Sequence, residues 1–209
     1  MDPFPTSING NKYILVITEY LTRWCEAIAL SDATANSVTQ ALLQRVIFPH
    51  GWPRQLLLDQ GSQFHSEVIR ILSHNLGITQ VFTSLYHPQS NGLTERLNRT
   101  IKQVTSTYVG PLHQSWDQVL PFAVHAYNTP VQESTRISPF RALYGRNPRF
   151  PPDVQSIKAQ PRRTDATECW LHLQTKQPLL RHAINHNLAW ANNDKKSILT
   201  LLTSRSSNK

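Results

Sequence analysis

Hydrophobic residues fall in short runs separated by polar turns, a pattern that predicts strands alternating with helices. The run Lys12 to Thr18 is rich in β-branched residues and follows Asn9-Gly10-Asn11, a tight-turn sequence, so we expect a strand there. Trp24 to Leu30 and Gln55 to Leu58 have the same character and predict two further strands. This spacing leaves room for helices between the strands and indicates an α/β domain.

Helix signals fill the intervals between the strands. Ser31 is expected to cap a helix that Pro49 and Gly51 end, and Ser66 is expected to cap a second helix that Gly77 ends. Further along the chain, the pattern predicts one more strand, Gln80 to Thr83, and helices over residues 93–108, 116–127 and 139–144. We therefore expect one helix between each two of the later strands and three helices after the last strand.

Proline spacing divides the chain. Residues 1–150 carry the alternating pattern and predict one domain, residues 151–163 form a Pro-rich linker, and residues 164–209 predict a helical extension with a polar tail. No run approaches the 18 or so apolar residues of a membrane span, and the N-terminus lacks a signal-peptide pattern, which together predict an intracellular protein without a membrane partner.

Charge narrows the class of partner. The 21 Lys and Arg residues exceed the 13 Asp and Glu residues and give a net charge of +8, which favours a polyanion such as DNA or RNA. A basic protein without a nucleic-acid partner fits the charge as well. The two cysteines, Cys25 and Cys169, lie far apart in sequence, and we expect them to be free thiols rather than part of a disulfide framework or a zinc module.

Two acidic residues stand in positions typical of a metal site. Asp59 directly follows the buried strand Gln55 to Leu58, and Glu95 lies in the first turn of the long helix. A carboxylate at the end of a buried strand needs a cation or hydrogen-bond donors, and two such groups would make half of a divalent-metal site. Spacing alone leaves two structural alternatives open, a turn in which Asp59 accepts hydrogen bonds near Gly61 and an i,i+4 ion pair between Glu95 and Arg99.

Several motifs together favour the metal-site interpretation of Asp59 and Glu95. The motifs are Asp59-Gln60-Gly61-Ser62-Gln63-Phe64, the segment from Tyr86-His87-Pro88-Gln89-Ser90-Asn91-Gly92 to Glu95-Arg96-Leu97-Asn98-Arg99, Ala126-Tyr127-Asn128-Thr129, and Ser138-Pro139-Phe140 to Gly145-Arg146. With this order and spacing, the region from Asn9 to Pro152 resembles the integrase catalytic core of gypsy-type LTR retrotransposons and, more distantly, of retroviruses.

The resemblance implies a ribonuclease-H-like mixed sheet flanked by helices, and DNA integration by metal-dependent phosphodiester cleavage and strand transfer. It implies an Asp, Asp, Glu triad that binds two Mg or Mn ions, with Asp59 as the second acid and Glu95 as the third. Element ends and target DNA would be the partners, in the nucleus, with a homo-oligomer as a further possibility. The residues implied to contact DNA are Tyr86, Gln89, Asn91, Arg99 and Lys102.

The family pattern is not matched at the start of the chain. Family members place the first catalytic Asp three residues before Gly-Pro, inside a central strand, whereas in the simplest register Asp2 occupies the glycine position before Pro3. Asp2 is the sole candidate for the first acid, and the first central strand is expected to be missing, which would leave buried backbone groups unpaired beside residues 12–18 and 55–58. Two alternative functions therefore stay open, a non-catalytic DNA-binding or dimerising remnant and a metal-dependent nuclease of the same fold.

Overall fold

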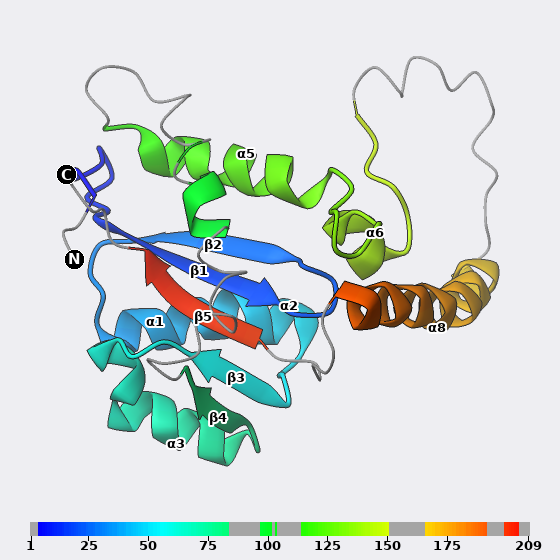
Figure 1. Cartoon of the computed structure of the whole chain (residues 1–209). Coiled ribbons are helices and arrows are strands. Elements are labelled where there is room, and N and C mark those ends of the chain that lie inside the picture. Colours follow the sequence, from blue (N-terminus) through cyan, green and yellow to red (C-terminus); the bar gives the residue numbers. More distant parts are fainter. Residues whose placement is uncertain are drawn as a thin grey trace. The chain divides into compact units, whose positions relative to one another are not determined.

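A computed structural model describes residues 4–83, 97–101, 103, 114–150, 166–191 and 199–204. Its centre is a five-stranded mixed sheet in the order β2-β1-β5-β3-β4 (Figure 1). The strands are β1 (Tyr13–Glu19), β2 (Cys25–Leu30), β3 (Gln55–Leu58), β4 (Thr79–Phe82) and β5 (Leu199–Ser204). The four strands predicted from hydrophobic runs are therefore present, with ends that differ by one residue at most.

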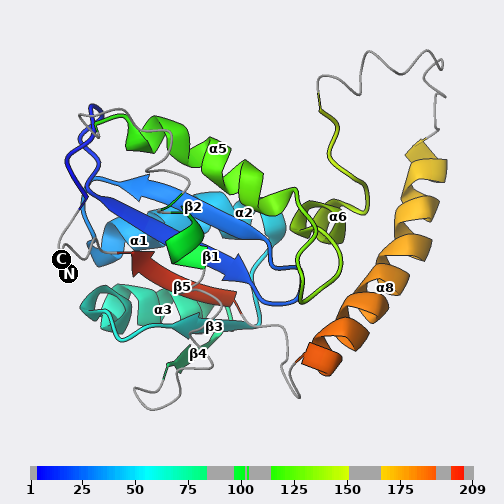
Figure 2. The same ribbon diagram turned by 45° about the horizontal axis from the view of Figure 1, so that its top comes forward.

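The fifth strand was not predicted. β5 lies between β1 and β3, antiparallel to β1 and parallel to β3 (Figure 2). We expected this position to be without a strand and the backbone groups of its neighbours to be unpaired. The described residues before β1 form no strand, as predicted, but the expectation of unpaired backbone groups is wrong, because Leu199–Ser204, from the segment predicted as extension and polar tail, pairs with both neighbours. The predicted domain boundaries themselves stay a prediction.

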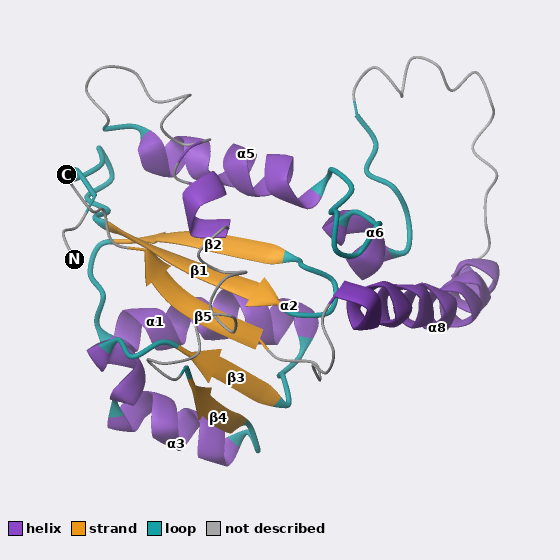
Figure 3. Cartoon of the chain, viewed as in Figure 1, coloured by secondary structure: helices purple, strands orange, loops and turns teal. Residues whose placement is uncertain are grey.

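Helices cover both faces of the sheet, α1 and α3 on one side and α5 on the other (Figure 3). The described helices are α1 (Ala35–Leu42), which continues through a π-helical turn (Leu43–Ile47) into α2 (Phe48–His50), then α3 (Glu67–Asn75), α5 (Trp116–Asn128), α6 (Pro139–Tyr144) and α8 (Ala166–Ala191). As predicted, Ser66 caps α3, where its side chain accepts from the Ile69 N–H, and Gly51 ends α2 with a φ of 80°.

The start of α1 differs from the prediction. Thr34, not Ser31, is the N-cap, and its side chain accepts from the Ser37 N–H. The reason lies in Asp32, whose Oδ1 accepts from the Thr34 N–H at 3.0 Å and from the Thr34 and Ser37 hydroxyls at 2.6 Å each. These bonds lower the pKa of Asp32 to about 2 and hold residues 31–33 outside the helix.

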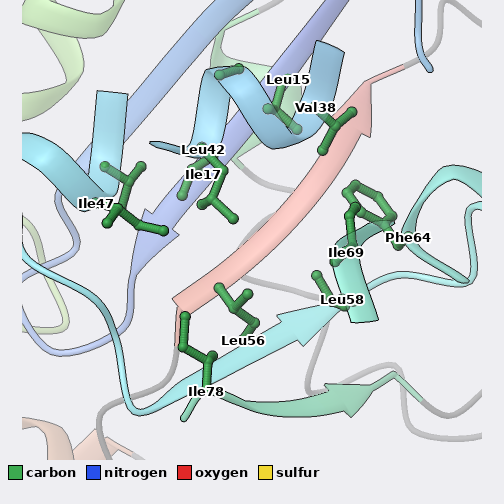
Figure 4. Packing of buried hydrophobic residues seen from close by; sticks show 12 residues of the cluster. Leu15, Ile17, Val38, Leu42, Ile47, Leu56, Leu58, Phe64, Ile69 and Ile78 are labelled. Atoms are coloured by element: carbon green, nitrogen blue, oxygen red, sulfur yellow. The ribbon is translucent and has the colours of Figure 1, made fainter. Parts of the chain in front are cut away.

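Two apolar clusters pack against opposite faces of β1. Leu15 and Ile17 join residues of α1, β3 and α3 in the first cluster (Figure 4). Ile14 and Val16 join Leu97 and residues of α5 in the second cluster. Alternate residues of a strand face opposite sides, so burial of all four identifies β1 as an interior strand with a helical layer on each face.

The turn before β1 is fastened to the start of α5 by one carboxylate. Asp117 Oδ2 accepts hydrogen bonds from Ser7 Oγ at 2.6 Å, Asn11 Nδ2 at 2.8 Å and Asn9 Nδ2 at 3.1 Å. Burial alone would raise the pKa of Asp117, but these bonds outweigh it and the pKa lies below its usual value. A charged acceptor thus holds the Asn9-Gly10-Asn11 turn that the sequence predicts.

The chain divides into two compact units. The first comprises residues 1–20, 25–127 and 196–209 and contains the sheet, and the second comprises residues 21–24 and 128–195. Within the second unit, Asn187 Nδ2 of α8 donates to the Thr135 carbonyl at 3.0 Å, and Ile184 is fully buried. None of the helices in the described parts of the chain is long and apolar enough to cross a bilayer.

Candidate metal and nucleic-acid site

The candidate site begins where β3 ends. Leu58, the last residue of β3, is fully buried, and the next residue, Asp59, is half-buried. Asp59 Oδ1 accepts a hydrogen bond from the Gly61 N–H at 2.8 Å. The turn role that spacing left open for Asp59 is therefore present, and it holds the carboxylate in place at the end of a buried strand.

Gly61 leaves space for two side chains of this turn. A β-carbon at Gly61 would lie 2.8 Å from Asp59 Oδ1 and 2.4 Å from Gln63 Nε2, closer than real β-carbons approach other atoms. Gln63 is buried, and so is Phe64, whose N–H donates to the Gly61 carbonyl at 2.9 Å. The motif from Asp59 to Phe64 is thus a compact turn. Phe64 anchors the turn in the core, and the Asp59 carboxylate packs against Gly61.

A second set of contacts joins this turn to the end of β4. Gln60 Nε2 donates to the Thr83 carbonyl at 2.6 Å, and Gln60 Oε1 lies 3.1 Å from His65 Nε2. The His65 ring stacks on Phe82, with centroids 4.3 Å apart and planes 9° apart. Thr83 is the last described residue before residue 97, so the Asp59 turn and the strand that leads into the predicted DNA-contacting loop are held together.

Sequence reasoning did not single out Gln60 or His65. Gln60 belongs to the motif that carries the family resemblance, but nothing in the spacing shows that its amide reaches the end of β4, 23 residues away. His65 is exposed and gives no sequence signal at all. Both contacts depend on the parallel pairing of β3 with β4, which brings Leu58 opposite Phe82.

The described part of the long helix has the predicted faces. Leu97 and Ile101 are buried in the cluster that also contains Val16, whereas Arg99 is exposed. The prediction that one face packs while Arg99 lies on the other is therefore confirmed for residues 97–101. The position of Arg99 on the exposed face leaves its guanidinium available to a phosphate.

The remaining predicted site residues cannot be placed. Glu95, Asp2, Tyr86, Gln89, Asn91 and Lys102 lie outside the described residues. Within the described residues, no group of three His, Cys, Asp or Glu side chains is arranged to hold a metal ion. Of the predicted metal ligands, only Asp59 has a described environment, and the triad with Glu95 and Asp2 stays a prediction.

Comparison with known proteins agrees with this architecture. The family model of the integrase core domain matches residues 1–88. The chain is 33% identical over 178 residues to the Pol polyprotein of radiation murine leukemia virus (strain Kaplan), which covers 82% of this chain and 29% of that protein. It is 27% identical over 149 residues to the retrovirus-related Pol polyprotein from transposon 412 of Drosophila melanogaster, covering 71% of this chain and 12% of that protein. The chain thus spans less than a third of the length of these relatives.

Solved structures give the same result. The catalytic core domain of BIV integrase matches 65% of this chain and 88% of its own, with 27% identity and a TM-score of 0.54. The HTLV-2 integrase core, solved with magnesium in a trimeric form, matches 65% of this chain and 87% of its own, with 20% identity and a TM-score of 0.53. The predicted ribonuclease-H-like fold class is confirmed, and the chain belongs to the integrase core family of retroviruses and LTR retrotransposons.

Proposed function

We propose that this chain is the core of a retroelement integrase and acts on DNA at the end of β3, where Asp59 lies. The observation that carries the proposal is the Asp59 turn, in which a buried strand delivers a fixed carboxylate beside Gly61 in a chain of the integrase core family. Element ends and target DNA are the proposed substrates, the nucleus is the proposed location, and a homo-oligomer is the proposed assembly.

Metal dependence belongs to the same proposal. Carboxylate oxygens are the ligands that Mg²⁺ and Mn²⁺ prefer, and Asp59 fits as one ligand because the Gly61 N–H fixes its orientation. Glu95 and Asp2 are the proposed partners. Asp59, with Glu95 and Asp2, would hold the ions, which when bound would supply Lewis-acid chemistry for cleavage of a phosphodiester. The role of the chain itself would be to position these ions and the DNA.

DNA binding is supported by charge. The surplus of eight positive charges favours contacts with phosphates, and Arg99 lies on the exposed face of its helix segment. Tyr86, Gln89, Asn91 and Lys102 complete the proposed DNA contacts. Because phosphate contacts release counterions, we expect little sequence preference and a steep dependence on salt.

The test is a titration of labelled duplex DNA by fluorescence anisotropy at two salt concentrations. Affinity should fall by at least about tenfold between roughly 50 and 200 mM salt. Arg99→Ala should weaken binding, whereas Arg70→Ala should not, because Arg70 already forms a bidentate ion pair with Glu67. Unchanged affinity at the two salts, or no binding at the lower salt, would contradict the proposal.

A second candidate is a non-catalytic DNA-binding protein of the same family. It is favoured by the sequence, in which Asp2, directly before Pro3, is the sole candidate for the first acid. For this chain we expect no strand transfer and at most trace Mn-dependent nicking of terminal DNA. Efficient joining of DNA ends that Asp2→Asn abolishes would exclude this candidate and identify Asp2 as the first catalytic acid.

A further inference from the structure

The motif that contains α6 has no part in the proposed metal site. It belongs to the second compact unit, and so does the turn at residues 21–24. Trp24 of that turn meets the Tyr144 ring edge to face, with ring centres 5.5 Å apart, and its ring centre lies 6.3 Å from that of Phe140. Phe140 and Tyr144 are 4.7 Å apart, so the three rings form one cluster. Tyr144 is still 42% exposed, which shows that the cluster reaches the surface.

Arg146 is held over this aromatic cluster. Gly145 ends α6 in the left-handed conformation, with a φ of 71°, and its N–H donates to the Arg141 carbonyl at 2.8 Å. After this cap, the Arg146 guanidinium carbon lies 5.2 Å from the centre of the Phe140 ring. A guanidinium that rests on a ring keeps a defined orientation, and N–H groups at its edge can still donate to an oxygen ligand.

The surface around the cluster is strongly basic. Residues 134–152 contain no Asp or Glu, and they contain four arginines, Arg136, Arg141, Arg146 and Arg149. All four arginines are exposed, and none of them takes part in the ion pairs between described residues. Arg141 and Tyr144 are three positions apart on α6 and therefore lie on the same side of the helix. Arg141 and Arg146 thus belong to the same surface as the aromatic cluster.

The chemistry of this surface fits phosphate groups. A guanidinium binds phosphate oxygens with two parallel N–H groups, and a set of cations without carboxylate partners attracts a polyanion. Nucleic-acid bases are a poorer match, because base binding needs an open ring face, whereas Arg146 lies over Phe140 and Trp24 meets Tyr144 edge to face. Duplex DNA presents closely spaced phosphates on its outside and is the ligand that the arginines match.

We propose that Arg141 and Arg146 form a second DNA-binding surface, which contacts the phosphate backbone of duplex DNA without reading its sequence. This surface goes beyond the proposed function, which places DNA at the Asp59 turn and at Arg99, both in the first compact unit. The aromatic cluster orients Arg146 and makes no base contact.

The salt dependence of duplex DNA binding measures the number of phosphate contacts. Because each contact contributes about 0.9 to the slope of log affinity against log salt, the double variant Arg141→Gln, Arg146→Gln should lose about 1.8 of the slope. Its affinity should fall equally for DNA duplexes of different sequence. The control is Lys176→Gln, Arg181→Gln, which removes the same charge from exposed positions of α8 in the same unit and should keep the slope. Equal changes in the two double variants would overturn the proposal.

A labelling experiment on the unchanged full-length chain avoids any effect of the substitutions on folding. Phenylglyoxal modifies accessible arginines, and mass spectrometry measures the modification of each one. Saturating duplex DNA should strongly reduce the labelling of Arg141 and Arg146 and leave that of Arg181 as it is. Labelling of Arg146 that DNA does not change would overturn the proposal, and so would protection by duplex RNA but not by duplex DNA.

The outcomes separate this surface from the DNA contacts of the proposed function. If the Arg141, Arg146 variant loses the slope while Arg99→Ala binds DNA as the unchanged chain does, the second surface stands and the contact at Arg99 falls. If Arg99→Ala weakens binding while the Arg141, Arg146 variant does not, the second surface is excluded and the proposed function stands. A chain that binds no duplex DNA at low salt excludes both.

Discussion

β1 and β5 are neighbouring strands in the interior of one sheet. The hydrophobic run of β1 predicts a strand, whereas β5 was not predicted from its sequence. β1 has five consecutive buried residues and follows a turn that Asp117 fastens, so its place is set by nearby sequence and by both helical layers. β5 is a six-residue segment that pairs with strands about 140 and 180 positions earlier in the chain. A strand can therefore lie in the interior of a sheet without the hydrophobic run that is typical of interior strands. Its neighbours must have backbone groups that are free to pair with it.

The largest expected effect comes from removing β5. A chain that ends at residue 198 leaves the pairs with β1 and β3 unmade, and each buried backbone group without a partner costs about 1–3 kcal/mol. Because a domain has only about 5–15 kcal/mol of net stability, we expect loss of the cooperative unfolding transition in circular dichroism. Removal of residues 205–209 alone is the control and should leave the transition in place. A cooperative transition at the same temperature in both chains would show that β5 does not complete the sheet.

Truncation of the β1 core is expected to have the next largest effect. Ile17 is 1% exposed, and Ile17→Ala should lower the free energy of unfolding by about 2–5 kcal/mol through lost burial and a cavity. Ile8 is 68% exposed, and Ile8→Ala should change it by no more than about 0.5 kcal/mol. Denaturant unfolding measures both. Similar losses for the two variants would contradict the placement of β1 in the interior.

A substitution in the Asp59 turn should cost less stability but affect the site. Gly61→Ala places a methyl group against the Asp59 carboxylate and the Gln63 amide, and overpacking of this kind costs about 1–3 kcal/mol. The same change should also weaken Mn²⁺ binding by the chain, because Asp59, the proposed ligand, would have to move. Ser62→Ala, at an exposed neighbour, is the control for both measurements. Normal stability and metal affinity in Gly61→Ala would show that the turn does not hold Asp59.

The smallest effect concerns the turn before β1. Asp117→Asn should lower stability at neutral pH by about 1 kcal/mol or less, since hydrogen bonds from Ser7, Asn9 and Asn11 lose their charged acceptor. The folded-state pKa of Asp117 is below its unfolded value, so its contribution is present above pH about 4 and lost as pH falls through the folded pKa. Unfolding measured from pH 7 to pH 2 should therefore show the difference between Asp117→Asn and the unchanged chain shrinking in acid.

Local signals were enough for most of the fold and for part of the site. Hydrophobic runs and caps predict β1, β3 and the cap of α3, because burial and capping depend on adjacent residues. They misplace the start of α1, where Asp32 competes for the N–H and hydroxyl donors of the first turn. The family motif identifies Asp59, but the bond from Gln60 to Thr83 and the place of β5 depend on pairing between distant strands, for which the sequence has no periodic signal.

Backbone amide hydrogen exchange tests the central claim most directly, that β5 completes the integrase-core sheet beside Asp59. If it does, the pairing amides of Leu199–Ser204 should exchange as slowly as those of Tyr13–Glu19, because both strands open only when the sheet unfolds. Slow exchange in β1 together with unprotected amides throughout residues 199–204 would contradict the account.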